Sequence, residues 1–242
     1  MDKLKDFLQV LDNNLDLDVT LNDPTKLNLF TKYMDGILEW NEKVNLTNIT
    51  DKNDFIAKHY IDSILCIGSD EFKDADTIID IGTGGGFPGV PLAILFPNKK
   101  FTLVDSLNKR LKIIKELCQQ LGIKNVQVVH GRAEELGHQK VMREKFDLCL
   151  SRAVANLSTL AELCLPFVAV GGSFVAYKGP GIEKELFDGE IAIEKLGGEV
   201  DRIEEPEGQD GQNHILLYIT KMTSTKKKYP RKPGEPARKP LK

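Results

Sequence analysis

The sequence predicts an α/β protein with a doubly wound, mostly parallel sheet and an N-terminal helical extension. Three observations support this prediction. From residue 76 onward short β-rich runs alternate with helical patterns, the first of these runs ends in a cluster of glycines, and residues 1–66 show helical periodicity. Such alternation is typical of βαβ units, which pair parallel strands and cover both faces of the sheet with helices. A chain of 242 residues is long enough for one such domain and a small extension.

Apolar residues define the helical extension. They recur three and four positions apart from Leu4 to Leu15, and again over 27–40 and 55–65. Asp23-Pro24 supplies a helix N-cap followed by proline at the first helical position. We expect an extension over 1–70, a main domain over 71–222 and a basic, proline-rich tail over 223–242.

The elements of the main domain follow from period and composition. We expect strands over 77–81, 102–104, 126–129, 146–150 and 173–177, and a closing strand pair over 199–204 and 214–221. We expect helices from about residue 90, over 107–121, near 157–165 and over 183–196, and a turn at 207–212.

Composition excludes several classes of protein. Apolar residues make up 41% of the chain and charged residues 29%, as in ordinary globular proteins. The longest apolar run, Val90–Phe96, falls far short of the roughly 20 residues of a membrane span. No secretory signal is visible, and the four cysteines are widely separated and form no metal-binding spacing. We therefore expect a cytoplasmic protein with reduced cysteines, no membrane segment and no metal. We also expect it to be a monomer.

Charge is concentrated at the C-terminus. The net charge is −3, yet Lys221–Lys242 contains nine basic residues and one acid, Glu235. Four prolines in this tail predict an extended chain that cannot form a helix interior. The tail is either a solvated solubilising segment or a contact for a polyanion such as RNA, whose phosphates attract lysine and arginine.

The glycine cluster is the strongest local motif. The expected first strand runs into Gly82-Thr-Gly84-Gly-Gly86-Phe87-Pro-Gly89, and a helix follows. A strand that stops in glycines lets the backbone turn tightly and approach a ligand closely. Because Gly84, Gly86 and Gly89 formally match G-x-G-x-x-G, an NAD-dependent oxidoreductase remains an alternative.

Two acids favour a different ligand. Asp80 precedes the glycines, where a carboxylate suits a cation better than a pyrophosphate, and Asp105-Ser106 ends the second strand, where a ribose diol would lie. S-adenosylmethionine has both a ribose and positive charge. Asp105 would also cap the helix near Leu107. After the third strand, Ala133 and Glu134 are the candidates for adenine contacts.

The segment after the fourth strand bears on the methyl acceptor. The run from Asp147 to Val154 lacks the Asn-Pro-Pro-Tyr type of motif that is usual in enzymes that methylate exocyclic amines of bases. Methylation of carbon-5 needs an exposed thiolate, whereas Cys149 lies within an apolar strand. An acceptor with a ready lone pair remains, and guanine N7 qualifies because it carries no proton and needs no general base. Arg152 would hold or stack on that base, or bind the cofactor carboxylate. Lys178 is a weaker candidate for a phosphate contact.

Six segments of the chain occur in an order typical of one family. They are Trp40-Asn with Asn45-Leu-Thr, Lys58-His59-Tyr-Ile-Asp62-Ser63, Asp80-Ile-Gly-Thr-Gly-Gly-Gly-Phe-Pro-Gly-Val-Pro-Leu, Asp105-Ser-Leu-Asn-Lys-Arg, Gly131-Arg-Ala-Glu and Phe146-Asp-Leu-Cys-Leu-Ser-Arg-Ala. Together with the tail from Tyr229, they resemble the bacterial glucose-inhibited division protein B family, the small-subunit ribosomal RNA guanine-N7 methyltransferases.

The resemblance implies a class I, Rossmann-like methyltransferase fold with S-adenosylmethionine as donor and S-adenosylhomocysteine as product. The implied acceptor is a guanine of 16S rRNA near the decoding site of the small ribosomal subunit. The implied cofactor positions are Gly82, Phe87, Ala133, Glu134 and Arg152, with Arg152 also the catalytic candidate. The implied substrate-side positions are His59, Asp62, Lys178, Tyr229, Arg231 and Arg238. An RNA-binding assembly factor that keeps the fold without chemistry is a third alternative.

Overall fold

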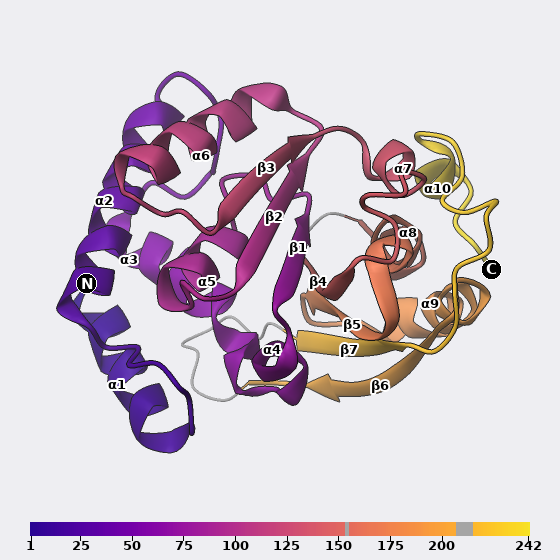
Figure 1. The fold of residues 1–242 in the computed structure, drawn as a ribbon, viewed down its shortest axis with the longest axis horizontal. Helices are drawn as coiled ribbons and strands as arrows, with labels where there is room; N and C mark the ends of the chain where they lie inside the picture. Colours follow the sequence, from indigo (N-terminus) through magenta and orange to yellow (C-terminus); the bar gives the residue numbers. More distant parts are fainter. Residues whose placement is uncertain (153–154, 207–214) are drawn as a thin grey trace.

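A seven-stranded sheet runs through the middle of the protein in a computed structural model that describes residues 1–152, 155–206 and 215–242 (Figure 1). The strands are β1 (Thr77–Ile81), β2 (Lys100–Asp105), β3 (Val126–His130), β4 (Phe146–Arg152), β5 (Val168–Lys178), β6 (Gly198–Glu204) and β7 (Ile215–Lys221). Their order is β3-β2-β1-β4-β5-β7-β6. The strands β1 to β5 are parallel to one another, and β7 is antiparallel to β5 and β6. The doubly wound sheet expected from the sequence is confirmed.

Helices cover both faces of this sheet. Before β1 lie α1 (Asp2–Asn14), α2 (Pro24–Asn41), α3 (Lys52–Phe55), a π-helical turn η1 (Ile56–Ile61), a 3₁₀ turn η2 (Leu65–Gly68) and α4 (Asp70–Asp74). Between and after the strands lie α5 (Gly89–Leu95), α6 (Asn108–Gln120), α7 (Ala133–Leu136), α8 (Leu157–Cys164), a 3₁₀ turn η3 (Leu165–Phe167), α9 (Glu183–Lys195) and α10 (Glu235–Arg238). Asp23 caps α2 as expected, because its carboxylate accepts the Thr25 and Lys26 amides at 2.7 and 3.1 Å.

Alternate residues of the strands enter two separate apolar cores. Ile78 belongs to a core shared with residues of α1, α2, α5 and α6, whereas Ile79 belongs to a core shared with residues of α7, α8 and α9. Figure 1 shows the labelled helices that surround the sheet. The N-terminal helices thus share one continuous core with the sheet. The division of the chain at residues 70 and 222 stays a prediction. The expected turn at 207–212 and the first residue of the last strand, His214, lie outside the described residues.

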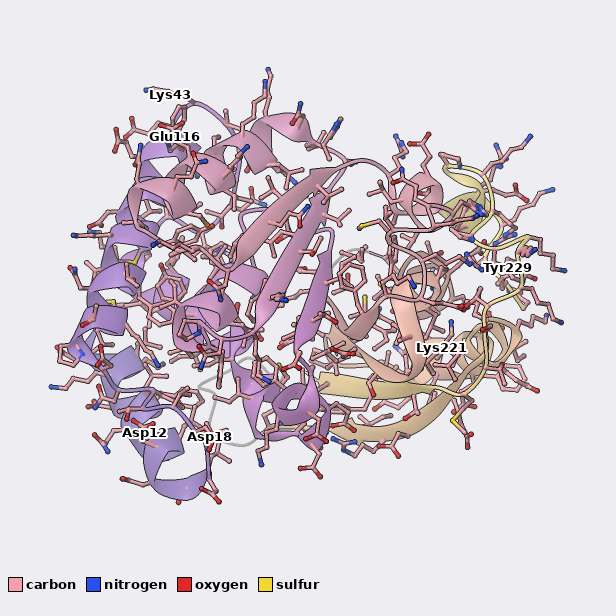
Figure 2. All side chains as sticks on the ribbon, viewed as in Figure 1. Asp12, Asp18, Lys43, Glu116, Lys221 and Tyr229 are labelled. Carbon is pink, nitrogen blue, oxygen red and sulfur yellow. The ribbon has the colours of Figure 1, made fainter. Side chains whose placement is uncertain are left out.

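The C-terminal tail differs from the extended chain that its prolines predict. It folds back along α7 and α8, forms the single turn α10, and buries Tyr229 (Figures 1 and 2). Pro236 fits α10 because it lies in the first helical turn, where a missing N–H costs nothing. Arg143 holds the start of the tail through the carbonyls of Thr225 and Tyr229, at 2.6 and 2.9 Å.

Two classes of feature are not found among the described residues. No described helix has the length and apolar character that a bilayer crossing requires. Within the same ranges, no group of three or more His, Cys, Asp or Glu side chains is arranged to hold a metal ion. All four cysteines, Cys66, Cys118, Cys149 and Cys164, are free thiols buried in the cores.

The glycine loop between β1 and α5 adopts backbone conformations that favour glycine. Gly82, Gly84 and Gly86 have φ of 76°, 59° and 89°. The loop also packs closely against α2, since the Tyr33 hydroxyl donates to the Gly85 carbonyl at 2.9 Å. A Cβ at Gly86 would lie 2.3 Å from that hydroxyl oxygen. The helical extension therefore holds the loop in place from one side.

We predict that Gly86→Ala lowers the free energy of unfolding by about 2 to 5 kcal/mol, from left-handed strain and a clash with Tyr33. Gly122→Ala is the matched control, because Gly122 has φ of 70° but no atom within 4 Å of its Cβ position. In that variant the free energy of unfolding should fall only by the cost of the left-handed strain, about 1 to 2 kcal/mol. Urea denaturation measures the free energy of unfolding of both variants. Equal losses of stability would contradict a close approach of Tyr33 to Gly86.

Candidate active site

A pocket of about 370 Å³ lies where β1, β2, β3 and β4 end at their carboxyl termini. Ligands of open parallel sheets bind at this edge, next to the point where the strand order reverses. Six of the expected cofactor residues line it: Gly82, Asp105, Ser106, Ala133, Glu134 and Arg152. Further lining comes from Arg132, which belongs to the quoted segment Gly131-Arg-Ala-Glu without an expected role of its own, and from Leu163, which the sequence did not single out. Asp80, Gly84, Gly86 and Phe87 are not part of the lining.

Asp105 joins the pocket to the glycine loop. Its Oδ2 accepts the Gly84 amide at 3.0 Å, and its Oδ1 accepts the Leu107 amide at 2.8 Å. Arg110 is also near, with 4.0 Å between its Nη1 and Oδ2. A carboxylate has about four lone-pair sites, so Asp105 retains capacity to accept from a ligand hydroxyl. The expected role at the pocket is compatible with this geometry, whereas the expected role as a helix cap is wrong. The N-cap of α6 is Leu107, and the Asp105 side chain binds the amide of that residue and no amide within the helix.

Asp80 lies beneath the glycine loop instead of in the pocket. Its side chain is buried, and Oδ2 accepts the Thr83 hydroxyl at 2.7 Å and the Gly89 amide at 3.0 Å. Oδ1 has no hydrogen-bond partner among the described residues. Burial raises the pKa of this carboxyl group to about 6. The sequence places an acid correctly at the end of β1, but its observed contacts are with the loop.

Arg152, the last residue of β4, is held by the helical extension. Its guanidinium donates to the Asp62 carboxylate, to the Lys58 carbonyl at 2.9 Å and to His59 Nδ1 at 3.0 Å. The Asp62 side chain of this ion pair is fully buried. The two positions expected on the substrate side, His59 and Asp62, therefore contact the catalytic candidate directly.

His59 is a neutral partner in this cluster. Its ring stacks on Phe87, with centroids 4.3 Å apart and an interplanar angle of 4°. Because Arg152 donates to Nδ1, the proton is on Nε2, which lies 2.6 Å from the Thr47 hydroxyl oxygen. Burial, followed by the charge of Arg152, lowers the pKa of His59 to about 3. Phe87 is thus a support for His59 and lies outside the pocket lining.

The remaining substrate-side candidates have contacts within the chain. Lys178 donates to the Ala155 carbonyl at 3.0 Å and pairs with Glu185 at 2.8 Å, so its ammonium group holds the segment before α8. Arg231 pairs with Glu162 at 2.6 Å. Tyr229 is buried and Arg238 is exposed. Their expected contacts with RNA stay predictions.

Several residues that make side-chain contacts with distant parts of the chain were not predicted from the sequence. Thr47 and Arg143 carry no local pattern that would predict their partners. Glu162 does carry one, because it is the only acid in the otherwise apolar or uncharged helix Leu157–Cys164. A single acid on a buried helix predicts a buried partner.

Comparison with known proteins assigns the family. The family model described as rRNA small subunit methyltransferase G (GidB) matches residues 26–216. The chain belongs to the GidB family. Two similar members are named ribosomal RNA small subunit methyltransferase G. The protein of Clostridium novyi is 47% identical, covering 98% of this chain and 96% of its own. That of Alkaliphilus oremlandii is 46% identical, covering 99% and 100%.

Solved structures share the fold of this GidB family member. Cofactor-bound Rv0187 from MTB has a TM-score of 0.57 and 18% identity, covering 90% of this chain and 98% of its own. A putative O-methyltransferase from Klebsiella pneumoniae has a TM-score of 0.54 and 12% identity, covering 92% and 99%. These likenesses confirm the expected class I methyltransferase fold.

We predict that His59 makes stability fall in acid. With a folded pKa of about 3 against 6.5 for the free side chain, the unfolded state binds more protons between these values. Stability from this group is full above about pH 6.5 and declines below it by up to about 1.4 kcal/mol per pH unit. His59→Asn keeps an acceptor for Arg152 but cannot titrate. In urea unfolding, the free energy of unfolding of His59→Asn should lie below that of wild type at pH 7, and this difference should shrink by pH 4.5. A difference that stays constant would contradict a buried neutral histidine.

Proposed function

We propose that this protein transfers a methyl group from S-adenosylmethionine to N7 of a specific guanine in the 16S rRNA of the small ribosomal subunit. The observation that carries the proposal is the pocket at the carboxyl ends of β1–β4, with Asp105 beside the glycine loop and Arg152 at its edge, in a GidB family chain. The expected monomer stays part of this proposal. A substrate on ribosomal subunits supports action in the cytoplasm.

The residues of the pocket suit the donor. Asp105 would accept from the ribose hydroxyls, with Gly82 and Ser106 beside it in the lining. Ala133 and Glu134, at the start of α7, would flank the adenine. Asp80 beneath the loop adds negative potential in its ionised form, which favours a cationic ligand over a pyrophosphate. When bound, S-adenosylmethionine supplies an electrophilic methyl group on a sulfonium.

The transfer needs positioning and no general base. The bond between guanine N7 and the methyl carbon forms as the carbon–sulfur bond breaks, and the electron pair of that bond stays on sulfur. Positive charge passes to the guanine ring, and no proton moves. A route to base carbon through a cysteine nucleophile has no support here, because Cys149 is buried and burial raises the pKa of its thiol. The protein therefore acts by orienting the base in line with the methyl group.

Arg152 is the residue best placed for that orientation. A guanidinium has five N–H donors, and the described contacts with Asp62, Lys58 and His59 use three of them. Among the described residues, the Nε donor and the second N–H of Nη2 have no hydrogen-bond partner, so they could donate to an acceptor oxygen in the pocket that Arg152 lines. That oxygen belongs either to guanine O6 or to the cofactor carboxylate, and the Arg152 variant described below distinguishes them.

The function is tested with purified protein, tritiated methyl donor and small-subunit particles. Label released by nuclease digestion as 7-methylguanosine is the expected result. Absence of label from free 16S rRNA and from every subunit preparation would favour an assembly factor without chemistry. Isothermal titration tests the oxidoreductase alternative, since heat with S-adenosylhomocysteine and none with NAD would eliminate it.

We predict that Arg152→Lys lowers the methylation rate by about a hundredfold or more, because lysine keeps a charge for Asp62 but loses the planar fork. Alanine is the poorer probe, since it would leave the buried Asp62 carboxylate without this cation and cost about 3 to 5 kcal/mol. If Arg152 orients guanine, titration should show S-adenosylhomocysteine affinity nearly unchanged. A parallel loss of affinity would assign Arg152 to the cofactor, and an unchanged rate would remove it from the site.

We predict that replacing Lys226, Lys227 and Lys228 with glutamine weakens RNA binding and flattens its salt dependence. Each lost phosphate contact should reduce the slope of log affinity against log salt by about 0.7 to 0.9. Arg231 is left intact, because its guanidinium binds Glu162. Filter binding from 50 to 300 mM salt measures the slope. Replacing Lys3 and Lys5 at the opposite end of the molecule is the control, and equal effects would leave the tail as a solubilising segment.

A further inference from the structure

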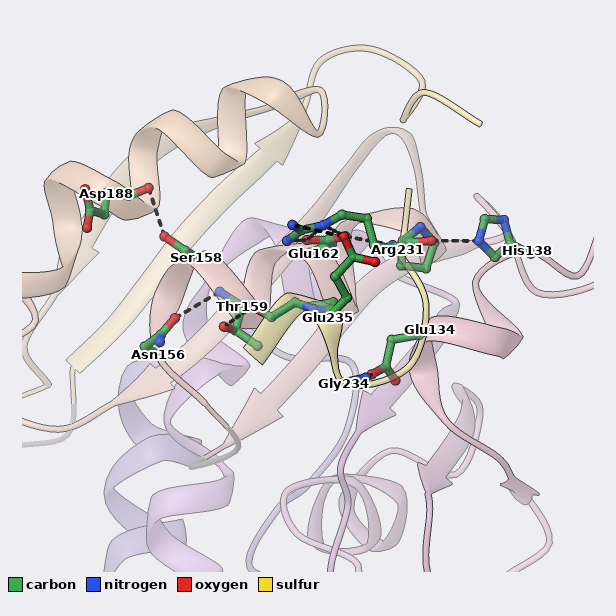
Figure 3. Close-up of polar contacts among 12 residues, drawn as sticks. Glu134, His138, Asn156, Ser158, Thr159, Glu162, Asp188, Arg231, Gly234 and Glu235 are labelled. Atoms are coloured by element: carbon green, nitrogen blue, oxygen red, sulfur yellow. Dashed lines mark hydrogen bonds and ion pairs between the residues drawn. The ribbon is translucent and has the colours of Figure 1, made fainter. Parts of the chain in front are cut away.

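The C-terminal tail contacts two of the elements that line the cofactor pocket, and we call these elements its two walls. One wall is α7 with the residues before it, and the other is α8, whose Leu163 lines the pocket. The rest of the lining comes from the ends of β1, β2 and β4 and from residues that follow β1 and β2. Figure 3 shows the tail lying across both elements, with Arg231 directed toward Glu162 on α8 and Gly234 toward Glu134 on α7. We define the segment Tyr229–Arg238 as the strap.

On α8 the strap makes a buried ion pair. Glu162 is 0% exposed, and its carboxylate accepts the Arg231 backbone amide at 2.7 Å, Nε at 2.9 Å and Nη2 at 2.6 Å. Glu162 precedes Leu163, which lines the pocket. Loss of one partner of a buried ion pair is costly, because the other charge remains desolvated. The position of this wall is therefore tied to Arg231.

On α7 the strap contacts a cofactor candidate itself. The Gly234 amide donates to Glu134 Oε1 at 2.9 Å, and Glu134 also lines the pocket. Gly234 has φ of 78°, a conformation that presents its amide without the strain a side chain would add. Two further bonds seat the strap, from His138 Nε2 to the Pro230 carbonyl at 2.7 Å and from the Thr159 hydroxyl to the Pro236 carbonyl at 3.1 Å.

The outer side of the same region carries exposed lysines alongside the acids Glu135 and Glu235. Lys227, Lys228 and Lys232 are exposed around the pocket of about 390 Å³ that the strap forms with His138 and Glu135. Ammonium groups at these positions would attract RNA phosphates. One short segment thus carries anchors to the cofactor pocket on its inner side and cations on its outer side.

We propose that the strap positions the two walls of the cofactor pocket and so couples binding of the methyl donor to docking of RNA, with Arg231 as a positioning residue. This inference rests on the proposed function. Binding of RNA to the exposed lysines favours the conformation in which the strap contacts α7 and α8. That conformation in turn favours binding of the methyl donor. By linkage, the donor strengthens RNA binding by the same factor.

The test compares substitutions at two adjacent residues, Arg231 and Lys232, by titrating each variant with S-adenosylhomocysteine to measure its affinity. Arg231→Gln should weaken binding by about tenfold, within the usual range of coupling between sites, and Arg231→Lys should recover part of it. Lys232→Gln is the matched control, since Lys232 is exposed. It should leave S-adenosylhomocysteine affinity unchanged and weaken RNA binding. Circular dichroism checks that each variant is folded.

Hydrogen exchange of the unmodified full chain tests the strap even if Arg231→Gln fails to fold. S-adenosylhomocysteine should slow exchange of the Arg231 and Gly234 amides, which donate to Glu162 and Glu134. The amides of the exposed residues 226–228 should respond to an rRNA fragment, and that fragment should tighten S-adenosylhomocysteine binding.

Two outcomes would overturn the proposed role of the strap. One is wild-type affinity for S-adenosylhomocysteine in Arg231→Gln, together with a loss of RNA affinity like that of Lys232→Gln. The other is no protection of the Arg231 and Gly234 amides by S-adenosylhomocysteine. Failure of the wild-type chain to bind S-adenosylhomocysteine at all would refute the proposed function instead, so the two failures are distinguishable.

Discussion

The site depends on two carboxylates that fix the glycine loop through its backbone amides. Asp105 binds the Gly84 amide and Asp80 binds the Gly89 amide. Because these acids end neighbouring parallel strands, sheet pairing sets the positions of both, and the loop inherits its shape from the sheet. Tyr33 completes the arrangement from α2. A loop with several left-handed residues is thereby held in one conformation, which a binding site for a small cofactor requires.

The helical extension contributes directly to the candidate active site. Asp62, His59 and Lys58 all bind Arg152, although 90 residues separate Asp62 from Arg152. Phe87 from the glycine loop stacks on His59, so the loop, η1 and the end of β4 meet in one cluster. Arg152 is therefore held by these contacts only when the extension has packed on the sheet.

Local patterns in the sequence predicted most of the fold. The run Thr77–Ile81 is a strand with the expected bounds, and α2 begins at the expected Asp23-Pro24 cap. The strand β5 starts five residues before the expected Ser173, because Val168 pairs with Phe146 across an irregularity in register that periodicity does not reveal. The tail was predicted from its charge and prolines, whereas Tyr229 and the buried Glu162 decide its packing. The partners of Arg152 and Arg143 were out of reach for the same reason: contacts between distant segments leave no local pattern.

Burial of the four cysteines has a consequence for measuring the protein. They lie on η2, α6, β4 and α8, so both cores contain thiols. Burial raises the pKa of Cys66 and Cys118 to about 12, which removes the reactive thiolate at neutral pH. Alkylating reagents can then reach these sulfurs only when the surrounding core opens. Each cysteine is a built-in reporter of local unfolding, and the order in which they are modified would map which core loosens first.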